Sequence, residues 1–262
     1  LPQKNLPLRS RGSYLHDYKA NQFTPNGAFD FTKNKYSVNG INSTLSDAAT
    51  LTRPDLGTMV DSDGVLKWSP HNLLTYSEDF SNADWVKSDS ASVTANQAIA
   101  PDGGLEADLI DLSGSDTARV VQGDFGATFS KTAGVWLRSV SGTGTFPIGY
   151  FEQGGDYVNT LVTLTETWQF FDLSIPTIGT NFGFSKRPLG TNPSLDAAYV
   201  WGAHAYRSDL GGMVNNPATL NSYVPTTSAA VYLPRVGNHV YDGSSWVNKG
   251  VLIEEATTNI YK

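Results

Sequence analysis

Residues 196–209 read D-A-A-Y-V-W-G-A-H-A-Y-R-S-D, and the rest of the chain can be organised around this segment. The run Tyr199-Val200-Trp201 combines aromatic and β-branched residues, which suits a half-buried strand. Gly202 follows directly, at a position where a strand bends or another backbone comes close. Downstream, Tyr223-Val224-Pro225 ends the segment, because proline has no N–H to donate to a β ladder.

The composition favours many short strands. The chain has 262 residues, of which 11% are aromatic and 16% charged, and its 25 glycines supply turns. With no cysteine it has neither a disulfide framework nor a thiolate metal site. The net charge of −7 argues against a general nucleic-acid binder.

No stretch approaches the roughly 20 apolar residues of a membrane span. The N-terminus has no signal-peptide pattern, and Leu1 suggests that the first residues are processed or absent from the numbering.

The clearest two-residue period lies in residues 134–140, G-V-W-L-R-S-V. In a strand, Val135 and Leu137 share one face, and Trp136 and Arg138 share the other. Several further segments alternate in the same way, and little helix is expected.

Four motifs carry a resemblance to a known family: N-L-L-T-Y-S-E-D-F-S-N-A-D-W at 72–85, V-T-A-N-Q-A-I-A-P-D-G at 93–103, Y-V-W-G-A-H at 199–204 and S-Y-V-P-T-T at 222–227. In order and spacing they resemble a domain common in structural proteins of tailed bacteriophages. That domain is similar to carbohydrate-binding modules with a jelly-roll β-sandwich. His204 stands where relatives often carry Gln.

The resemblance and the strand pattern together predict an all-β chain with four parts. Residues 72–230 form a carbohydrate-binding-module-like jelly roll, and 31–71 form a β segment leading into it. Residues 1–30 form an extended basic arm. Residues 231–262 form a C-terminal β hairpin, since 234–261 resemble 53–76, and the two similar segments are expected to form a small β layer or to pack separately.

The arm carries four basic residues, Lys4, Arg9, Arg11 and Lys19. We interpret it as a docking arm that lies on an acidic neighbouring subunit. A solvated tail is the alternative.

Sequence motifs for catalysis are absent. The four histidines form no H-E-x-x-H, and there is no G-x-S-x-G elbow and no P-loop. We therefore expect a non-enzymatic protein that requires no cofactor. A polysaccharide-degrading enzyme needs two carboxylates converging in a cleft, which a sequence cannot show.

Aromatic residues are the remaining sequence feature that indicates a binding function. Trp136 with Arg138, and Tyr150 with Glu152, fit a glycan-binding platform at strand period, and Tyr157 is placed to rim it. Polar neighbours would bond the sugar hydroxyls while the rings stack on the sugar. Core or cross-strand packing is the alternative for each ring, and for Trp85 and Trp246 both interpretations stay open.

The resemblance also implies a structural calcium ion between the first and last strands. Glu78, Asp79 and Asp196 are the matching carboxylates. The alternative is that they are turn and edge carboxylates in water.

For the whole protein, the resemblance implies a phage or phage-like virion subunit, a head or tail fibre or decoration protein assembled in the bacterial cytoplasm and released from it. It would be a homo-oligomer that contacts other virion subunits and attaches to host cell-surface polysaccharide. A purely structural subunit without glycan binding is the alternative. A groove on a sheet favours glycan binding, whereas a flat apolar patch favours a subunit interface.

Overall fold

A computed structural model describes residues 27–49, 53, 55–125, 128–155, 157–187, 192–214 and 222–252. The described residues form two compact units. The larger comprises the described parts of 53–58 and 66–233, and the smaller those of 1–52, 59–65 and 234–262. The basic residues of the predicted arm, Lys4, Arg9, Arg11 and Lys19, lie outside the described residues. The four sequence-derived boundaries stay a prediction.

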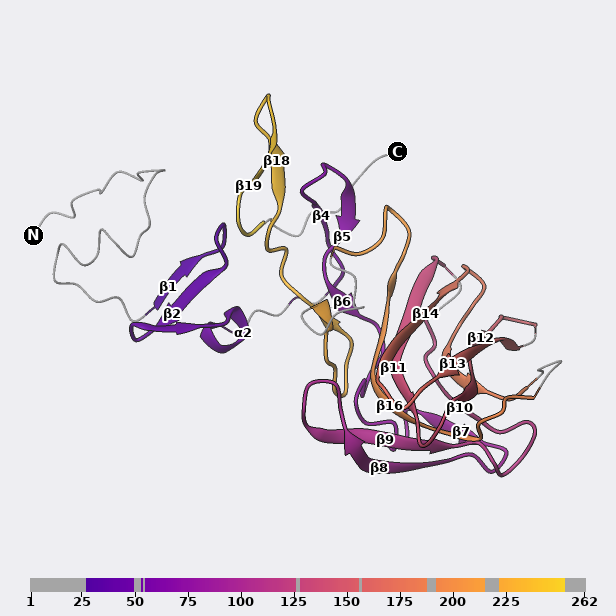
Figure 1. Ribbon diagram of the computed structural model, residues 1–262. Helices are drawn as coiled ribbons and strands as arrows, with labels where there is room; N and C mark the ends of the chain where they lie inside the picture. The colour runs from indigo at the N-terminus through magenta and orange to yellow at the C-terminus, as the bar shows by residue number, and fades with distance from the viewer. Residues whose placement is uncertain are drawn as a thin grey trace, which may run out of the picture. The chain divides into compact units, whose positions relative to one another are not determined.

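The larger unit is a β-sandwich of two antiparallel five-stranded sheets (Figure 1). The first sheet has the strand order β13-β12-β15-β10-β7. The second sheet has the order β14-β11-β16-β9-β8. The predicted all-β, jelly-roll fold is thereby confirmed.

The strands of the first sheet are β7 (Val86–Ser88), β10 (Arg119–Gln122), β12 (Gly144–Phe151), β13 (Tyr157–Leu164) and β15 (Phe182–Ser185). Those of the second sheet are β8 (Ser92–Ile99), β9 (Leu105–Asp111), β11 (Lys131–Ser139), β14 (Gln169–Ile175) and β16 (Ala197–Arg207). Three short strands, β5 (Leu66–Trp68), β6 (His71–Asn72) and β17 (Val231–Tyr232), complete the larger unit. Strand β4 (Thr58–Val60) begins in the larger unit and ends in the smaller one.

The alternation along β11 follows the prediction. Val135 and Leu137 are fully buried between the sheets, whereas Trp136 and Arg138 lie half-buried on the opposite face. Each fully buried aliphatic side chain stabilises the fold by about 1.5–3 kcal/mol. The two-residue period therefore sets which face of β11 belongs to the core.

Aromatic rings fill one part of the core. The centroids of Phe80 and Trp85 are 4.5 Å apart, and those of Phe80 and Phe184 are 6.1 Å apart. The indole Nε1 of Trp85 donates to the carbonyl of Tyr76 at 3.0 Å, so its one polar atom is satisfied. Of the two interpretations open for Trp85, core packing is the one observed.

Asn72 joins the segments that the sequence motifs single out. Its Nδ2 donates to the carbonyls of Ala203 and Val224, each at 2.9 Å. Its Oδ1 accepts from the N–H groups of Leu74 at 3.1 Å and Ala205 at 3.0 Å. All four bonding positions of this buried amide are used, so one side chain connects three distant stretches of chain.

Gly202 bends strand β16 as predicted. Trp136 of β11 pairs with Trp201 and Gly134 pairs with His204, so β16 contains one extra residue. Gly202 has a φ of +67°, in the left-handed region that favours glycine. This β-bulge changes the direction of the strand at the aromatic motif.

The smaller unit contains a three-stranded sheet of β1 (Gly27–Asp30), β2 (Lys35–Val38) and β3 (Ile41–Ser43). One short helix, α2 (Leu45–Ala48), and a hairpin of β18 (His239–Tyr241) and β19 (Trp246–Asn248) complete it. No helix among the described residues is long and apolar enough to span a membrane.

The two similar sequence segments pack on each other within the smaller unit. The N–H of Val60 donates to Oδ1 of Asn238 at 3.0 Å. A Cβ at Gly64 would lie 2.2 Å from the indole of Trp246, so this ring covers the glycine. In each segment an aspartate, Asp61 or Asp242, accepts N–H groups of the following turn at 2.9 Å.

Candidate functional site

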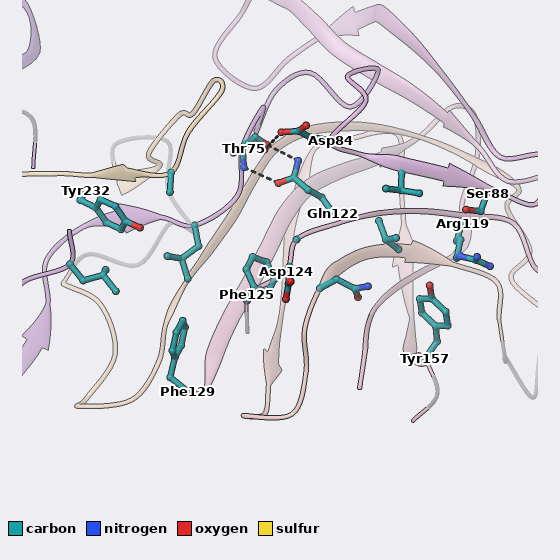
Figure 2. A pocket seen from close by; sticks show the side chains of 17 residues that line it. Thr75, Asp84, Ser88, Arg119, Gln122, Asp124, Phe125, Phe129, Tyr157 and Tyr232 are labelled. Atoms are coloured by element: carbon teal, nitrogen blue, oxygen red, sulfur yellow. Dashed lines mark hydrogen bonds between the residues drawn. The ribbon is translucent and has the colours of Figure 1, made fainter. Parts of the chain in front are cut away.

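A groove of about 750 Å³ lies on the outer face of the first sheet (Figure 2). Figure 2 shows Tyr232 at one end and Arg119 with Tyr157 at the other. Its lining consists of Leu56, Leu73, Thr75, Asp84, Val86, Ser88, Arg119, Val121, Gln122, Gly123, Asp124, Phe125, Phe129, Tyr157, Asn181, Ala230 and Tyr232. The volume falls within the range of about 300–1,000 Å³ that is usual for ligand sites.

One end of the groove is built by residues from two strands that are not neighbours in the sheet. Between these strands, Gly183 of β15 pairs with Gly149 of β12, and a Cβ at Gly149 would lie 2.1 Å from Oδ1 of Asn159. Arg119 on β10 and Tyr157 on β13 are separated by these two strands. Their side chains nevertheless meet, with the guanidinium carbon of Arg119 5.6 Å from the ring centroid of Tyr157. Strands β10 and β13 thus build one end of the groove together.

One wall is held by hydrogen bonds between side chain and backbone. Gln122 accepts from the N–H of Thr75 through Oε1 and donates to its carbonyl through Nε2, both at 2.8 Å. The Thr75 hydroxyl donates to Oδ2 of Asp84 at 2.7 Å. Because these groups satisfy one another, they fix the wall in place (Figure 2).

The aromatic wall is held by cations. Phe129 contacts two cations: Nζ of Lys131 lies 5.0 Å from its ring centroid, and the guanidinium carbon of Arg207 lies 4.4 Å from it. Lys131 also lies 5.8 Å from the ring of Phe125 and donates to the Gly179 carbonyl at 2.7 Å. Burial lowers the pKa of Lys131. These cation–π contacts orient both rings toward the groove.

Three hydroxyl groups remain available in the groove. Among the described residues, those of Ser88, Tyr157 and Tyr232 have no hydrogen-bond partner, whereas the Thr75 hydroxyl is used internally. A hydroxyl both donates and accepts, so these groups suit a ligand that also carries hydroxyls.

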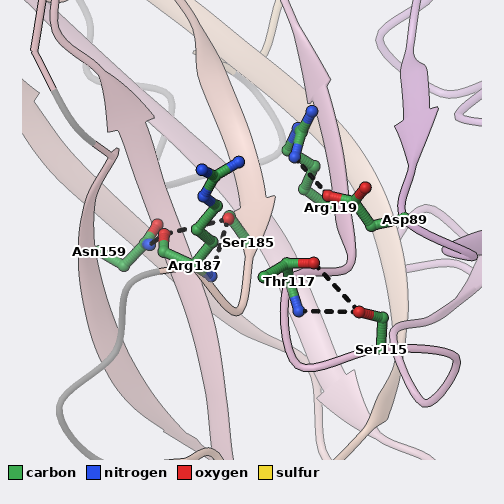
Figure 3. A network of polar contacts seen from close by, with 7 residues as sticks. All are labelled: Asp89, Ser115, Thr117, Arg119, Asn159, Ser185 and Arg187. Carbon is green, nitrogen blue, oxygen red and sulfur yellow. Dashed lines mark hydrogen bonds and ion pairs between the residues drawn. The ribbon is translucent and has the colours of Figure 1, made fainter.

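The Arg119 end of the groove continues into a polar network (Figure 3). Nη1 of Arg119 pairs with Oδ2 of Asp89 at 2.5 Å. Nearby, Asn159 Nδ2 donates to the carbonyl of Arg187, whose N–H donates to the Ser185 hydroxyl at 3.1 Å. The positive charge of Arg119 is thus neutralised within the chain.

The five predicted glycan-binding residues do not share one surface. Tyr157 lines the groove. Tyr150 packs against the core between the sheets, and Glu152 forms a bridge with Gly179 at the end of the same strand. Trp136 and Arg138 lie on the outer face of the second sheet. The expectation of a single platform is wrong, because β11 belongs to the other sheet and because Tyr150 faces the core while Tyr157 faces outward.

The outer face of the second sheet carries a separate aromatic cluster. Trp201, 2% exposed, packs with Ala98, Ala100 and Ala107, and Trp136 packs against this group. The Trp136 and Phe170 ring centroids are 5.5 Å apart. These rings largely cover one another.

The three carboxylates predicted to bind calcium lie in different polar surroundings. Asp196 accepts from Lys186 Nζ at 2.9 Å, and Asp79 accepts from the Ser81 hydroxyl at 2.6 Å. Burial raises the pKa of Glu78. The described residues contain no group of three His, Cys, Asp or Glu side chains arranged to hold a metal. The calcium ion stays a prediction.

Most of the groove was not found from the sequence. Its key members outside the prediction are Asp84, Arg119, Asp124, Phe125, Phe129 and Tyr232. The alternation around Val120, which is buried in the core, could have placed Arg119 and Val121 on the outer face. No local signal shows that β10 and β13 lie in the same sheet.

No family model matches the chain, and no curated protein matches it. Among solved structures, the chain is similar to the C-terminal family 22 carbohydrate-binding module of Clostridium thermocellum Xyn10B. The two are 14% identical, the match covers 53% of this chain and 94% of that chain, and the TM-score is 0.38. It is also similar to the Clostridium thermocellum xylanase 10B fragment with CBM22-1 and GH10 modules, with 12% identity, coverages of 53% and 28%, and a TM-score of 0.37. The enzymatically active domain of bacteriophage CBA120 tailspike protein 4 matches with 16% identity, coverages of 51% and 21%, and a TM-score of 0.34. The chain thus spans between a fifth and a third of the latter two chains. Similarities at this level do not identify a function.

Proposed function

We propose that the groove on the first sheet binds a neutral, hydroxyl-rich glycan without cleaving it. The observation that supports this most directly is the combination, in one groove of about 750 Å³, of aromatic rings and unpaired hydroxyl groups. Phe125, Phe129 and Tyr157 provide apolar surface for the C–H faces of sugar rings. Ser88 and Tyr232 provide hydrogen bonds to sugar hydroxyls.

The charge of the lining favours a neutral ligand. Arg119 is its one cation, and Asp89 already neutralises it. Asp84 and Asp124 add two carboxylates to the lining. An anionic sugar would approach these carboxylates and find no unpaired cation among the lining residues, so it should bind less well than a neutral one.

The two carboxylates also define the enzymatic alternative. A glycosidase uses an acid and a base or nucleophile on either side of the scissile bond. Asp84 is instead hydrogen-bonded to Thr75 as part of the wall. We therefore propose binding alone, and a product assay decides between the two.

The role of the whole protein is a further part of the proposal. The resemblance of its sequence motifs supports a subunit of a phage or phage-like virion, present in several copies. Many weak sites on one particle would then raise the avidity for a host surface polysaccharide. A purely structural subunit is the alternative, and it does not require the groove.

The test is titration of the folded protein with a panel of neutral oligosaccharides and host-surface polysaccharides by calorimetry. Tyr157→Ala should weaken binding about tenfold or more, which is about 1.4 kcal/mol. The matched control is Tyr241→Ala, since Tyr241 is 54% exposed in the smaller unit and lies outside the groove. This variant should bind like the original protein.

Absence of saturable binding to every glycan, by protein shown to be folded, would contradict the proposal and favour the purely structural role. Release of reducing ends that is lost in Asp84→Asn would instead establish the enzymatic alternative.

A further inference from the structure

Three arginines of the larger unit stack on aromatic rings, and two of them also pair with an aspartate. Arg119 lies 5.6 Å from the Tyr157 ring and pairs with Asp89. Arg207 lies 4.0 Å from the Trp68 ring, and its Nε donates to Asp209 at 3.0 Å. In both cases the guanidinium lies over an aromatic ring and also pairs with a carboxylate. This is the arrangement that a planar cation prefers.

Arg138 also contacts aromatic rings, but it has no aspartate partner among the described residues. Its guanidinium carbon lies 4.5 Å from the ring centroid of Tyr199 and 5.4 Å from that of Trp168. Among the described residues it forms no ion pair and no hydrogen bond. Its Nε is buried without a partner, whereas Nη1 and Nη2 are not among the buried unpaired atoms. The terminal edge of the guanidinium therefore faces solvent.

The surroundings hold Arg138 in this orientation. It pairs with Tyr199 across strands β11 and β16, which sets the position of that ring. Trp168 is fixed by its indole Nε1, which donates to the carbonyl of Ile99 at 3.0 Å. A guanidinium held between two rings has already lost much of its side-chain freedom, so binding of a ligand causes little further loss of conformational entropy.

We infer that Arg138 binds the carboxylate of an acidic sugar residue, at a site separate from the groove. A carboxylate matches the two Nη groups and would supply the partner that Asp89 and Asp209 supply to the other two arginines. The neighbouring rings Trp136, Trp168 and Tyr199 are each half-buried, so the site offers a small contact and not a wide docking surface. A sugar ring carrying a carboxylate fits such a contact better than a protein surface does.

The experiment uses trigalacturonate as the probe, with its methyl ester as the uncharged counterpart, followed by calorimetry and by the NMR signals of the arginine side chains. With the groove weakened by Tyr157→Ala, the protein should bind the acid at least tenfold more tightly than the ester and shift the Arg138 signal. Adding Arg138→Met keeps an unbranched apolar side chain between the rings and should abolish this preference. The matched control is Lys249→Met, which removes an exposed cation of the smaller unit and should keep the preference.

Equal binding of acid and ester, or an acid preference that survives in Arg138→Met, would overturn the inference. Oligoglutamate of the same charge that binds as tightly as trigalacturonate would overturn the assignment to a sugar. Should Arg138→Met fail to fold, the NMR titration of the original protein decides, since an unmoved Arg138 signal contradicts the inference. The ester is a neutral glycan of the kind proposed for the groove, so acid and ester are compared in the Tyr157→Ala background, and the two proposals can then fail separately.

Discussion

The two outer faces of the sandwich are both rich in aromatic residues, yet they use them differently. On the first sheet, Tyr157 pairs with Phe151 at a ring-centroid distance of 5.1 Å, and Tyr157 borders a groove. On the second sheet, Trp136 pairs directly with Trp201 across the strands, and both pack into a cluster with small alanine side chains. Both faces thus pair aromatic side chains across strands, and they differ in whether the rings border a groove or pack into a secondary core.

The arginines of the two faces differ in whether a carboxylate pairs with them. Arg119 beside the groove has its own counter-ion in Asp89, whereas Arg138 on the second sheet has none among the described residues. The cation that lines the groove is thus neutralised, and the one in the second-sheet cluster is unpaired. This contrast is the basis on which we propose a neutral ligand for the groove and an acidic one for Arg138.

The largest effect is expected from truncating the second-sheet cluster. Trp201→Ala should lower the free energy of unfolding by about 3–5 kcal/mol, because it leaves a cavity among Ala98, Ala100 and Ala107. Tyr157→Ala on the first sheet should cost less than about 1 kcal/mol, as expected for a half-buried side chain at a groove. Urea unfolding of both variants measures the difference. Comparable losses would mean that the groove residue is as structural as the cluster.

The next largest effect is expected from lowering the pH, which should reduce the free energy of unfolding. Burial lowers the pKa of His204 to about 3 and that of His71 to about 4, both from 6.5. The unfolded chain gains these protons as the pH falls below about 6.5, whereas the folded chain gains them only near the lowered pKa values. Stability is thus fully present above pH 6.5 and decreases toward pH 4, by an amount on the order of 3 kcal/mol for each histidine. Thermal unfolding between pH 7 and pH 4 measures this.

His204→Gln is the control for the acid effect. A glutamine amide can replace the Nε2 donor that lies 2.7 Å from the His71 carbonyl, and it does not titrate. The variant should show a shallower loss of stability with acid. An unchanged pH profile would show that other groups are responsible.

The smallest effect on stability is expected from Asp89→Asn. The ion pair with Arg119 is partly exposed, so its loss should change the free energy of unfolding by less than about 1 kcal/mol. The change leaves Arg119 stacked on Tyr157 without a counter-ion, as Arg138 is on Tyr199. The groove should then bind trigalacturonate more tightly than in the original protein. No gain would show that a missing counter-ion is not what distinguishes the two faces.

Local periodicity predicted several features correctly. The alternation of Val135 and Leu137 with Trp136 and Arg138 describes the two faces of β11 as they are observed. The bend at Gly202 also follows from sequence. The motif that begins at Asn72 and the motif that ends at Pro225 do belong together, because Asn72 bonds to Ala203 and Val224.

The predicted binding surface failed both in the assignment of strands to sheets and in the assignment of residues to faces. Tyr150 and Tyr157 lie on neighbouring strands of one sheet, yet one packs on the core and the other lines the groove. Arg119 reaches Tyr157 across β12 and β15, and β15 comes from a distant part of the chain.

For this protein, the order of residues is sufficient to place strands, their inner and outer faces, and the glycine bend, because these depend on the geometry of a few consecutive residues. The partners of those strands are set by long-range packing. That packing decides which aromatic residue borders a groove and which packs into a cluster, and which arginine pairs with an aspartate. A binding surface depends on these encounters, so it is established only once the two sheets have formed.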